Sequence, residues 1–280
     1  MNCLLVINTM SGNSCRVNEK DIIAKYAADD DVTVKYLRSP SDEYDVDGVD
    51  KLIVCGGDGT LNHALSLCAE KRINLYYLPC GTFNETAKSI SGKGICELAE
   101  LGKIGDRGFA YVAAAGSFTD LGQAANSSAK KRFKLFAYFA KVLSSYRVHR
   151  IRAEITTEKI SLSGTYTLIM VSNAKRCFGF RFNRLHEKQS DQLQLIAIKA
   201  PKKDNLWGRI KMFFPFFRVF FLGIGKEVRH NNILVTSFKE GNIHLSEDIP
   251  FCLDGESLLL SGDLTVKKGG GATRVFLIKE

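Results

Sequence analysis

The segment Gly56-Gly57-Asp58-Gly59-Thr60-Leu61-Asn62 has the residue types best suited to chemistry in this chain. It lies where we expect a buried strand to end and a helix to begin, the position at which α/β sheets bind ligands. Glycines let backbone N–H groups approach an anion closely, and a helix N-terminus favours negative charge. Asp58 beside a polyphosphate would need a cation, so the pattern favours a nucleotide bound with Mg²⁺. A tight turn with Thr60 as helix N-cap explains the same residues equally well.

Two further loops have a similar composition. Asn8 to Asn13 follows one predicted strand and Leu78 to Asn84 follows another, and both are rich in small polar residues. Each loop alone is typical of a capping turn. Because the carboxyl ends of parallel strands lie at one edge of a sheet, we expect all three loops to meet there. Three such loops together favour a ligand site.

Short apolar runs that end in Gly, Pro, Ser or Asn predict the strands that position these loops. The runs are Leu4–Ile7, Val32–Tyr36, Leu52–Cys55 and Leu75–Leu78. They alternate with helical spacing over Glu19–Ala28 and Leu61–Lys71. The alternation predicts a parallel sheet covered by helices over roughly the first 120 residues.

The pattern changes after this point. A basic helix is expected over Ala129–Tyr146 and an aromatic one over Asn205–Leu222. Runs with a period of two predict strands at Arg150–Thr156, Tyr166–Ser172, Leu193–Ile198 and Ile233–Ser237, and the tail Leu264–Ile278 has a strand–turn–strand pattern. We therefore expect an α/β domain over residues 1–122 and a mainly antiparallel β domain over 123–280, whose last strand or strands can pack back on the first domain.

Composition excludes several classes of protein. With 280 residues, 45% of them hydrophobic and 25% charged, the chain is an ordinary folded protein. Its net charge of +9 favours anionic partners such as phosphates, nucleic acid or acidic lipid. Eight cysteines without a CxxC pair predict buried thiols in a reducing compartment. We expect no signal peptide, and the apolar stretch Met212–Gly225 is too short to span a bilayer.

The motifs GGDGTLN and LPCGTFN, with Asp254-Gly255-Glu256 far downstream, together resemble the diacylglycerol kinase catalytic family. That family includes bacterial soluble lipid kinases and sphingosine and ceramide kinases, and the similarity follows essentially the whole chain in order. The resemblance implies an N-terminal nucleotide-binding α/β domain related to that of NAD kinases. It also implies a C-terminal β-sandwich, with the active site in the cleft between the two domains.

The resemblance further implies which residues bind ATP. Thr9 stands where proline is usual in the first phosphate loop, and Ser39 matches a hydroxyl near the nucleotide, although a turn cap also explains that serine. The implied ATP-binding residues are Asn8, Ser11, Gly12, Ser39, Gly56, Gly57, Asp58, Gly59, Thr60, Asn62, Gly81, Thr82 and Asn84.

The implied catalytic residues are Glu256, Asp120 and Asp254. Glu256 is the candidate base that removes the proton of a lipid hydroxyl, and Asp120 matches an acidic residue that the family places against it. Two close carboxylates raise one pKa, which suits proton transfer. As isolated features, Asp254-Gly255 is typical of a hairpin turn and Asp120 of a solvated loop acid.

A structural Mg²⁺ is implied at Asp191, held by its carboxylate and by the backbone carbonyls of Lys188 and Leu193. Gln192 replaces the glycine that is usual beside this aspartate. A plain surface aspartate at the start of a strand explains Asp191 about as well.

These observations predict an ATP- and Mg²⁺-dependent lipid kinase that acts on diacylglycerol or a related lipid. We expect it in the cytoplasm and peripherally on a membrane, with no nucleic-acid partner and with a homodimer as one possible assembly. A kinase on a soluble acceptor such as NAD, and an inactive lipid-binding module, are the alternatives. The aromatic segment Leu206–Leu222 is either a membrane-docking element or a core helix, and the basic helix from Lys130 to Lys141 is the other candidate for docking.

Overall fold

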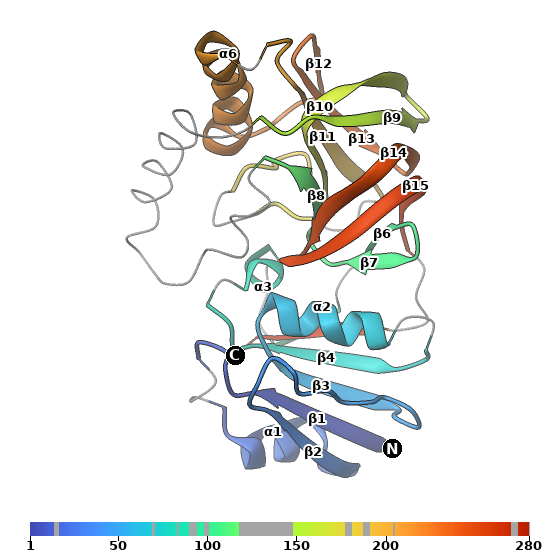
Figure 1. The fold of residues 1–280 in the computed structure, drawn as a ribbon. Coiled ribbons are helices and arrows are strands. Elements are labelled where there is room, and N and C mark those ends of the chain that lie inside the picture. Colours follow the sequence, from blue (N-terminus) through green and yellow to red (C-terminus); the bar gives the residue numbers. More distant parts are fainter. Residues whose placement is uncertain are drawn as a thin grey trace. The chain divides into compact units, whose positions relative to one another are not determined.

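The computed structural model of the protein divides into two compact units, Met1–Leu101 with Gly269–Glu280, and Gly102–Lys268 (Figure 1). The residues that the structure describes are 1–13, 17–68, 71–82, 84–89, 94–97, 101–117, 148–176, 181–186, 191–203, 205–269 and 274–279. The predicted basic helix over Ala129–Tyr146 lies outside these residues.

The first unit contains a six-stranded sheet in the order β2-β1-β3-β4-β16-β5. Its strands are β1 (Asn2–Asn8), β2 (Asp31–Leu37), β3 (Lys51–Gly56), β4 (Asn74–Pro79), β5 (Gly94–Glu97) and β16 (Arg274–Lys279). All neighbours are parallel except β5, which is antiparallel to β16. The four strands predicted in this region are confirmed, and the last strand of the chain returns to pair with β4.

Both faces of this sheet are buried at its central strands β1 and β3. Cys3, Leu5 and Ile7 of β1 pack in one cluster with Ile22 of helix α1 (Glu19–Tyr26). The intervening Leu4 and Val6 are also buried. Burial of successive residues explains why the strands are continuous apolar runs rather than alternating ones.

The second unit is built on a ten-stranded antiparallel sheet, in the order β12-β13-β11-β10-β8-β14-β15-β6-β7 with β9 paired to β10 and β14. The strands are β6 (Gly102–Ile104), β7 (Arg107–Phe109), β8 (Val112–Gly116), β9 (Ile151–Thr157), β10 (Ile160–Ser172), β11 (Leu193–Lys199), β12 (Val228–His230), β13 (Ile233–Phe238), β14 (Glu240–Leu253) and β15 (Glu256–Lys268). Side chains from nearly every strand meet in one core, as in a β-sandwich. The predicted fold class, a parallel α/β part followed by an antiparallel β part, is confirmed.

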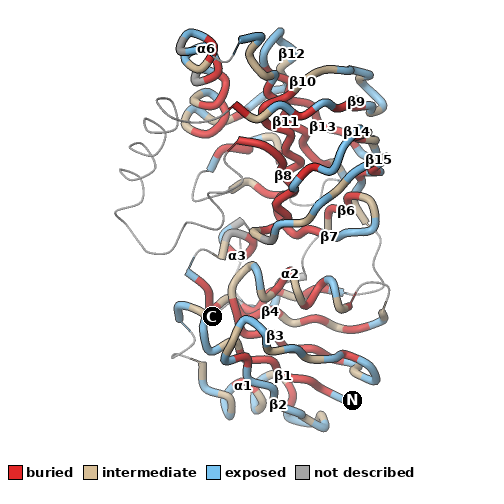
Figure 2. Tube along the Cα trace, viewed as in Figure 1, coloured by how far each residue is buried: buried red, intermediate tan, exposed pale blue. Residues whose placement is uncertain are grey.

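The two units divide earlier in the chain than the predicted boundary at residue 122. Ile104 of β6 pairs with Val266 of β15, and Ala113 of β8 pairs with Leu253 of β14, so residues 102–116 belong to the antiparallel sheet. The run Val-Ala-Ala-Ala-Gly of β8 is apolar throughout, which is equally typical of a parallel strand. Burial of β8 on both faces accounts for this ambiguity (Figure 2).

Helix α6 (Leu206–Phe217) and the π-helical turn η2 (Arg218–Leu222) pack against this unit. Met212, Phe216, Val219 and Phe220 are buried in a second core with residues of β10 and β11, such as Met170 and Ile196. Other positions of the helix, such as Trp207, Ile210 and Phe214, are exposed (Figure 2). One face of the predicted aromatic helix is therefore a core face.

We expect the double replacement Phe216→Ser with Phe220→Ser to lower the free energy of unfolding by several kcal/mol, because it leaves cavities and buries hydroxyl groups. Chemical denaturation followed by circular dichroism measures the change. The control is Trp207→Ser with Phe214→Ser, which alters exposed positions of the same helix and should change stability by less than about 1 kcal/mol. Equal stability of the two double variants would contradict the packing described here.

Candidate functional site

Helix α2 (Asp58–Leu67) begins directly after β3 with Gly57 as its N-cap residue. Thr60 lies inside the first turn, so the alternative that made Thr60 the cap is wrong. Glycine has no side chain with which to cap the helix, and the first backbone N–H groups of a helix have no partner within it. A Cβ on Gly59 would meet no described atom within 4 Å outside its own helix and chain neighbours. The N-terminus of α2 is therefore accessible to an anion.

The loop after β4 packs directly on this helix start. The backbone N–H groups of Cys80 and Gly81 donate to the carbonyl oxygen of Gly56 over 2.7 and 3.1 Å. A Cβ on Gly81 would lie 2.5 Å from the Cα of Gly57, closer than any side chain can approach. Glycine at position 81 is thus required for the two loops to touch.

The loop after β1 contacts both the start of α2 and the loop after β4. Asn8 donates through Nδ2 to Thr60 Oγ1 over 2.8 Å, and the backbone N–H of Asn13 donates to Cys80 O over 2.8 Å. Asn13 also donates through Nδ2 to Gly81 O over 3.2 Å. A Cβ on Gly12 would lie 2.6 Å from Thr82 Oγ1. The structure therefore brings together the three loops that the sequence predicted to meet.

Within the first loop, the N–H of Ser11 donates to Asn8 O over 3.2 Å and closes a turn. Thr9, which stands in place of a proline, donates its backbone N–H and its hydroxyl to Leu37 O over 3.0 and 2.8 Å. Proline has no N–H and could not make the first of these bonds. Threonine thus attaches the loop to the end of β2.

Asp58 connects to a polar cluster that sequence patterns did not indicate. Its Oδ1 accepts a hydrogen bond from the backbone N–H of Thr86, at 3.1 Å, in helix α3 (Glu85–Ser89). The hydroxyls of Tyr77 and Thr86 and the Oδ1 of Asn84 are buried without a hydrogen-bond partner among the described residues. Burial raises the pKa of Tyr77 well above its ordinary value, and the charge of Asp58 adds to this effect. Buried polar atoms without partners suit a ligand that brings its own donors and acceptors.

The sequence gives no signal for this polar cluster. Tyr77 lies inside an apolar strand, and Thr86 is one of several small residues in a short helix, so neither has a spacing that distinguishes it. Asn84 has a positive φ of 48° and donates through Nδ2 to Gly81 O over 2.9 Å. Of the other predicted ATP-binding residues, Asn62 is buried within α2.

Ser39 has a local role in the described structure. Its hydroxyl donates to Asp42 Oδ1 over 2.8 Å, and the backbone N–H of Arg38 donates to Asp42 Oδ2 over 2.6 Å. These hydrogen bonds, with that from Arg38 the largest, hold the pKa of Asp42 below its ordinary value. Asp42 thus caps the turn that follows β2, and the Ser39 hydroxyl supports the capping carboxylate.

Asp254 forms the turn between β14 and β15 and anchors it. Asp254 and Gly255 have φ values of 50° and 105°, and Leu253 pairs with Glu256 across them, as in a two-residue hairpin. The buried carboxylate of Asp254 accepts hydrogen bonds from three consecutive backbone N–H groups, those of Ala110, Tyr111 and Val112, the last two over 3.0 and 2.9 Å. The predicted hairpin turn is confirmed, and these contacts anchor it to β8 and the residues before it.

The other two predicted catalytic residues are described only in part or not at all. Glu256 is the first residue of β15, which fixes its backbone directly after the anchored turn, but its side chain lies outside what the structure describes. Asp120 also lies outside the described residues.

At the implied metal site, Asp191 forms an ion pair with Lys239, with 2.5 Å between Oδ2 and Nζ. This hydrogen bond lowers the pKa of Asp191. Leu193 is buried in β11, and Lys188 is outside the described residues. No group of three or more His, Cys, Asp or Glu side chains is arranged to hold a metal in the described part of the chain. In this structure Asp191 is thus paired with an ammonium group, and the metal site implied by the resemblance stays a prediction.

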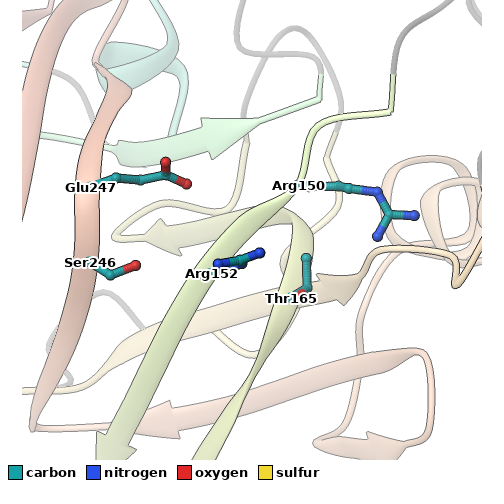
Figure 3. A pocket seen from close by; sticks show the side chains of 5 residues that line it. All are labelled: Arg150, Arg152, Thr165, Ser246 and Glu247. Atoms are coloured by element: carbon teal, nitrogen blue, oxygen red, sulfur yellow. The ribbon is translucent and has the colours of Figure 1, made fainter.

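A hollow of about 510 Å³ lies in the second unit, beside the register shift of β14 between Leu245 and Ile249. Figure 3 shows Arg152 between Thr165 on one side and Ser246 and Glu247 of β14 on the other, while Arg150 is turned away from them. None of the predicted site residues lines this hollow.

Comparison with known families adds independent evidence. Residues 2–107 match the family model described as the diacylglycerol kinase catalytic domain. Over these residues the chain is similar to the diacylglycerol kinase catalytic domain. The family match confirms the predicted resemblance and the prediction of an enzyme of the lipid kinase class.

Relatives extend the similarity beyond this region. The chain is 24% identical to a diacylglycerol kinase of Staphylococcus carnosus over 81% of this chain and 74% of that protein. It is 25% identical to one of Bacillus subtilis, over 74% of this chain and 71% of the relative.

Two solved structures have a similar fold. A diacylglycerol kinase of Bacillus anthracis superposes with a TM-score of 0.60 at 17% identity, covering 98% of this chain and 96% of that one. An NAD kinase of Archaeoglobus fulgidus in complex with ATP superposes with a TM-score of 0.52 at 12% identity, covering 100% and 94%. At these identities the likeness concerns the fold alone.

We expect Asp254→Ala to lower the free energy of unfolding by about 3 kcal/mol or more, because three buried N–H groups would lose a charged acceptor. Urea denaturation measures the loss. Asp263→Asn is the matched control, since Asp263 is an exposed acid of β15 and its loss should cost less than about 1 kcal/mol. A stable Asp254→Ala variant would show that the turn does not depend on this anchor.

Proposed function

We propose that the protein is an ATP- and Mg²⁺-dependent lipid kinase that phosphorylates a hydroxyl group of diacylglycerol or a related lipid. The observation that carries this proposal is the contact of three loops around the accessible N-terminus of α2, in a chain whose residues 2–107 match the diacylglycerol kinase catalytic domain. The match supports the class of acceptor, and the loops support the phosphate donor.

The first unit has the features that ATP needs. Phosphate oxygens would accept hydrogen bonds from the first N–H groups of α2, where the helix dipole also favours negative charge. The accessible space beside Gly59 leaves room for them, and the buried Oδ1 of Asn84 can accept a donor of the nucleotide. Asp58 is the residue that would hold Mg²⁺, which neutralises phosphate charge when it is bound.

The second unit supplies the candidate base. Transfer of a phosphoryl group to an alcohol requires that the hydroxyl proton be taken up, and Glu256 has the right chemistry for this step. The anchored Asp254 turn fixes the backbone immediately before Glu256. This rigidity would allow the glutamate to be held in one orientation toward its acceptor.

The deciding experiment is a radiolabelled-ATP assay of the whole chain against diacylglycerol, monoacylglycerol, phosphatidylglycerol, sphingosine, ceramide and NAD, with and without Mg²⁺. Phosphorylation of one lipid that needs Mg²⁺ is the expected result. Phosphorylation of NAD alone would replace the lipid with a soluble acceptor. Failure to turn over ATP with any acceptor would leave an inactive lipid-binding module as the better description.

We expect Gly59→Val to weaken ATP binding by at least about tenfold, because the side chain would fill the space proposed for phosphate. Isothermal titration measures the affinity. Gly108→Val in β7 is the matched control, since a Cβ there also meets no described atom within 4 Å. Both variants should fold. Unchanged affinity in Gly59→Val would place the phosphates elsewhere.

We expect Glu256→Gln to lower turnover by about 10² to 10⁴, because glutamine keeps the shape of glutamate but cannot take up a proton. ATP affinity should stay unchanged. Asp263→Asn, further along β15, controls for the loss of one negative charge on that strand. Turnover near that of the parent would exclude Glu256 as the base.

A further inference from the structure

One side of α6 exposes large apolar side chains to solvent. Trp207 is 71% exposed, Phe214 is 64% exposed and Ile210 lies between them at 37%. Their spacing of three and four residues puts them on one side of the helix. Leu222, at the end of η2, is 59% exposed. We call Trp207, Ile210 and Phe214 the α6 face.

Basic residues border the α6 face. Lys202, Lys203, Lys211 and Arg218 are exposed. From Lys199 to Arg229 the sequence has eight basic and two acidic residues. One of these acids, Glu227, is already bonded to Lys159 Nζ over 2.8 Å and to the N–H of Ser237 over 2.9 Å. The other, Asp204, lies outside the described residues. The surroundings of the α6 face are therefore strongly positive.

A groove of about 700 Å³ lies beside the start of α6. Its lining includes four lysines and the apolar surface of the helix, and no carboxylate is among its described lining residues. The lysines are Lys199, Lys202, Lys203 and Lys211, and they lie with Trp207 and Met212. Basic and apolar groups in one groove suit a molecule that has an anionic head and an apolar body.

The backbone that holds these lysines is fixed in place. Arg150 donates through its guanidinium to the carbonyl oxygens of Pro201 and Lys202 over 2.7 and 3.2 Å. A Cβ on the buried Gly208 would lie 2.2 Å from Lys203 O, so only glycine lets the loop pack against the helix. Asn205 caps α6 by accepting from the N–H of Gly208 over 2.9 Å. The backbone from Pro201 to the start of α6 is thus held in one arrangement.

We propose that the α6 face docks on the surface of an anionic lipid bilayer. Trp207, Ile210 and Phe214 would enter the boundary between headgroups and acyl chains, while the neighbouring lysines would bind lipid phosphates. Charge complementarity determines this choice of occupant, because the basic groove matches an anionic surface. The role in catalysis rests on the proposed lipid kinase function, whereas docking itself needs no ATP.

Trp207 provides a direct measurement, since it is the single tryptophan of the chain. On titration of the whole protein with vesicles of phosphatidylcholine and phosphatidylglycerol, its fluorescence should shift to the blue, and brominated acyl chains should quench it. Vesicles of phosphatidylcholine alone should cause much smaller changes. The same response to both vesicles, or to neither, would overturn the proposal.

Two sets of variants separate the apolar and the basic parts, each read by cosedimentation with the anionic vesicles. Trp207→Ser with Phe214→Ser should lower the partition coefficient at least about tenfold. Lys202→Gln, Lys203→Gln and Lys211→Gln together should lower it about a hundredfold. Leu162→Ser with Leu259→Ser is the matched control, because both leucines are exposed elsewhere in the second unit, and it should bind like the parent. Parent-like binding by either α6 variant would overturn the proposal.

Activity distinguishes failure of docking from failure of the kinase assignment. The Trp207→Ser, Phe214→Ser variant should phosphorylate a water-dispersed short-chain diacylglycerol at the parent rate, but lose activity on diacylglycerol in vesicles. Loss of both activities would show that the α6 face serves the reaction itself and would overturn the docking role. If the parent binds anionic vesicles as predicted but phosphorylates neither substrate, docking holds and the proposed function fails.

Discussion

The close contact between two backbones, at Gly57 and Gly81, is the constraint on which the candidate site depends. A Cβ on Gly81 would come within 2.5 Å of the Cα of Gly57, so the loops after β3 and β4 can touch only without a side chain there. That contact places Cys80 O and Gly81 O where Asn13 of the β1 loop donates to both. Three segments that are remote in sequence are thereby held around the start of one helix.

In the second unit, a buried carboxylate joins segments that are remote in sequence, as the contact between Gly57 and Gly81 does in the first unit. The Asp254 carboxylate bonds three consecutive N–H groups of residues more than 140 positions away in the chain. Burying a carboxylate is costly unless such donors compensate it. Because Asp254 itself has a positive φ, the tight turn and the anchor are two properties of a single residue. The result is a rigid backbone immediately before Glu256.

Sequence patterns predicted the parts of the fold that depend on local burial. The strands from Leu4 to Leu78 end in loops at one edge of a parallel sheet. The alternation of apolar runs with helical segments, together with the glycines that follow the strands, was sufficient to predict that these loops meet. The patterns could not predict the buried hydroxyl of Tyr77 beside Asp58, because Tyr77 lies within an apolar strand. They also could not predict that the first unit ends at Leu101, because β8 has the composition of a parallel strand. The pairing of Asp191 with Lys239 was also hidden, since it joins residues that are 48 positions apart.

The aromatic helix shows why one sequence pattern supported two interpretations. Met212, Phe216, Val219 and Phe220 fill a core against the antiparallel sheet, whereas Trp207, Ile210 and Phe214 face solvent. Pro215 has no N–H to donate within the helix, and the following turn is π-helical. Phe216, Val219 and Phe220 follow Met212 by four, seven and eight residues, which is the spacing of one helix face, so a single core face continues from α6 into η2. Since the core face fixes how the helix rotates about its axis, it also determines which aromatic side chains remain on the outside.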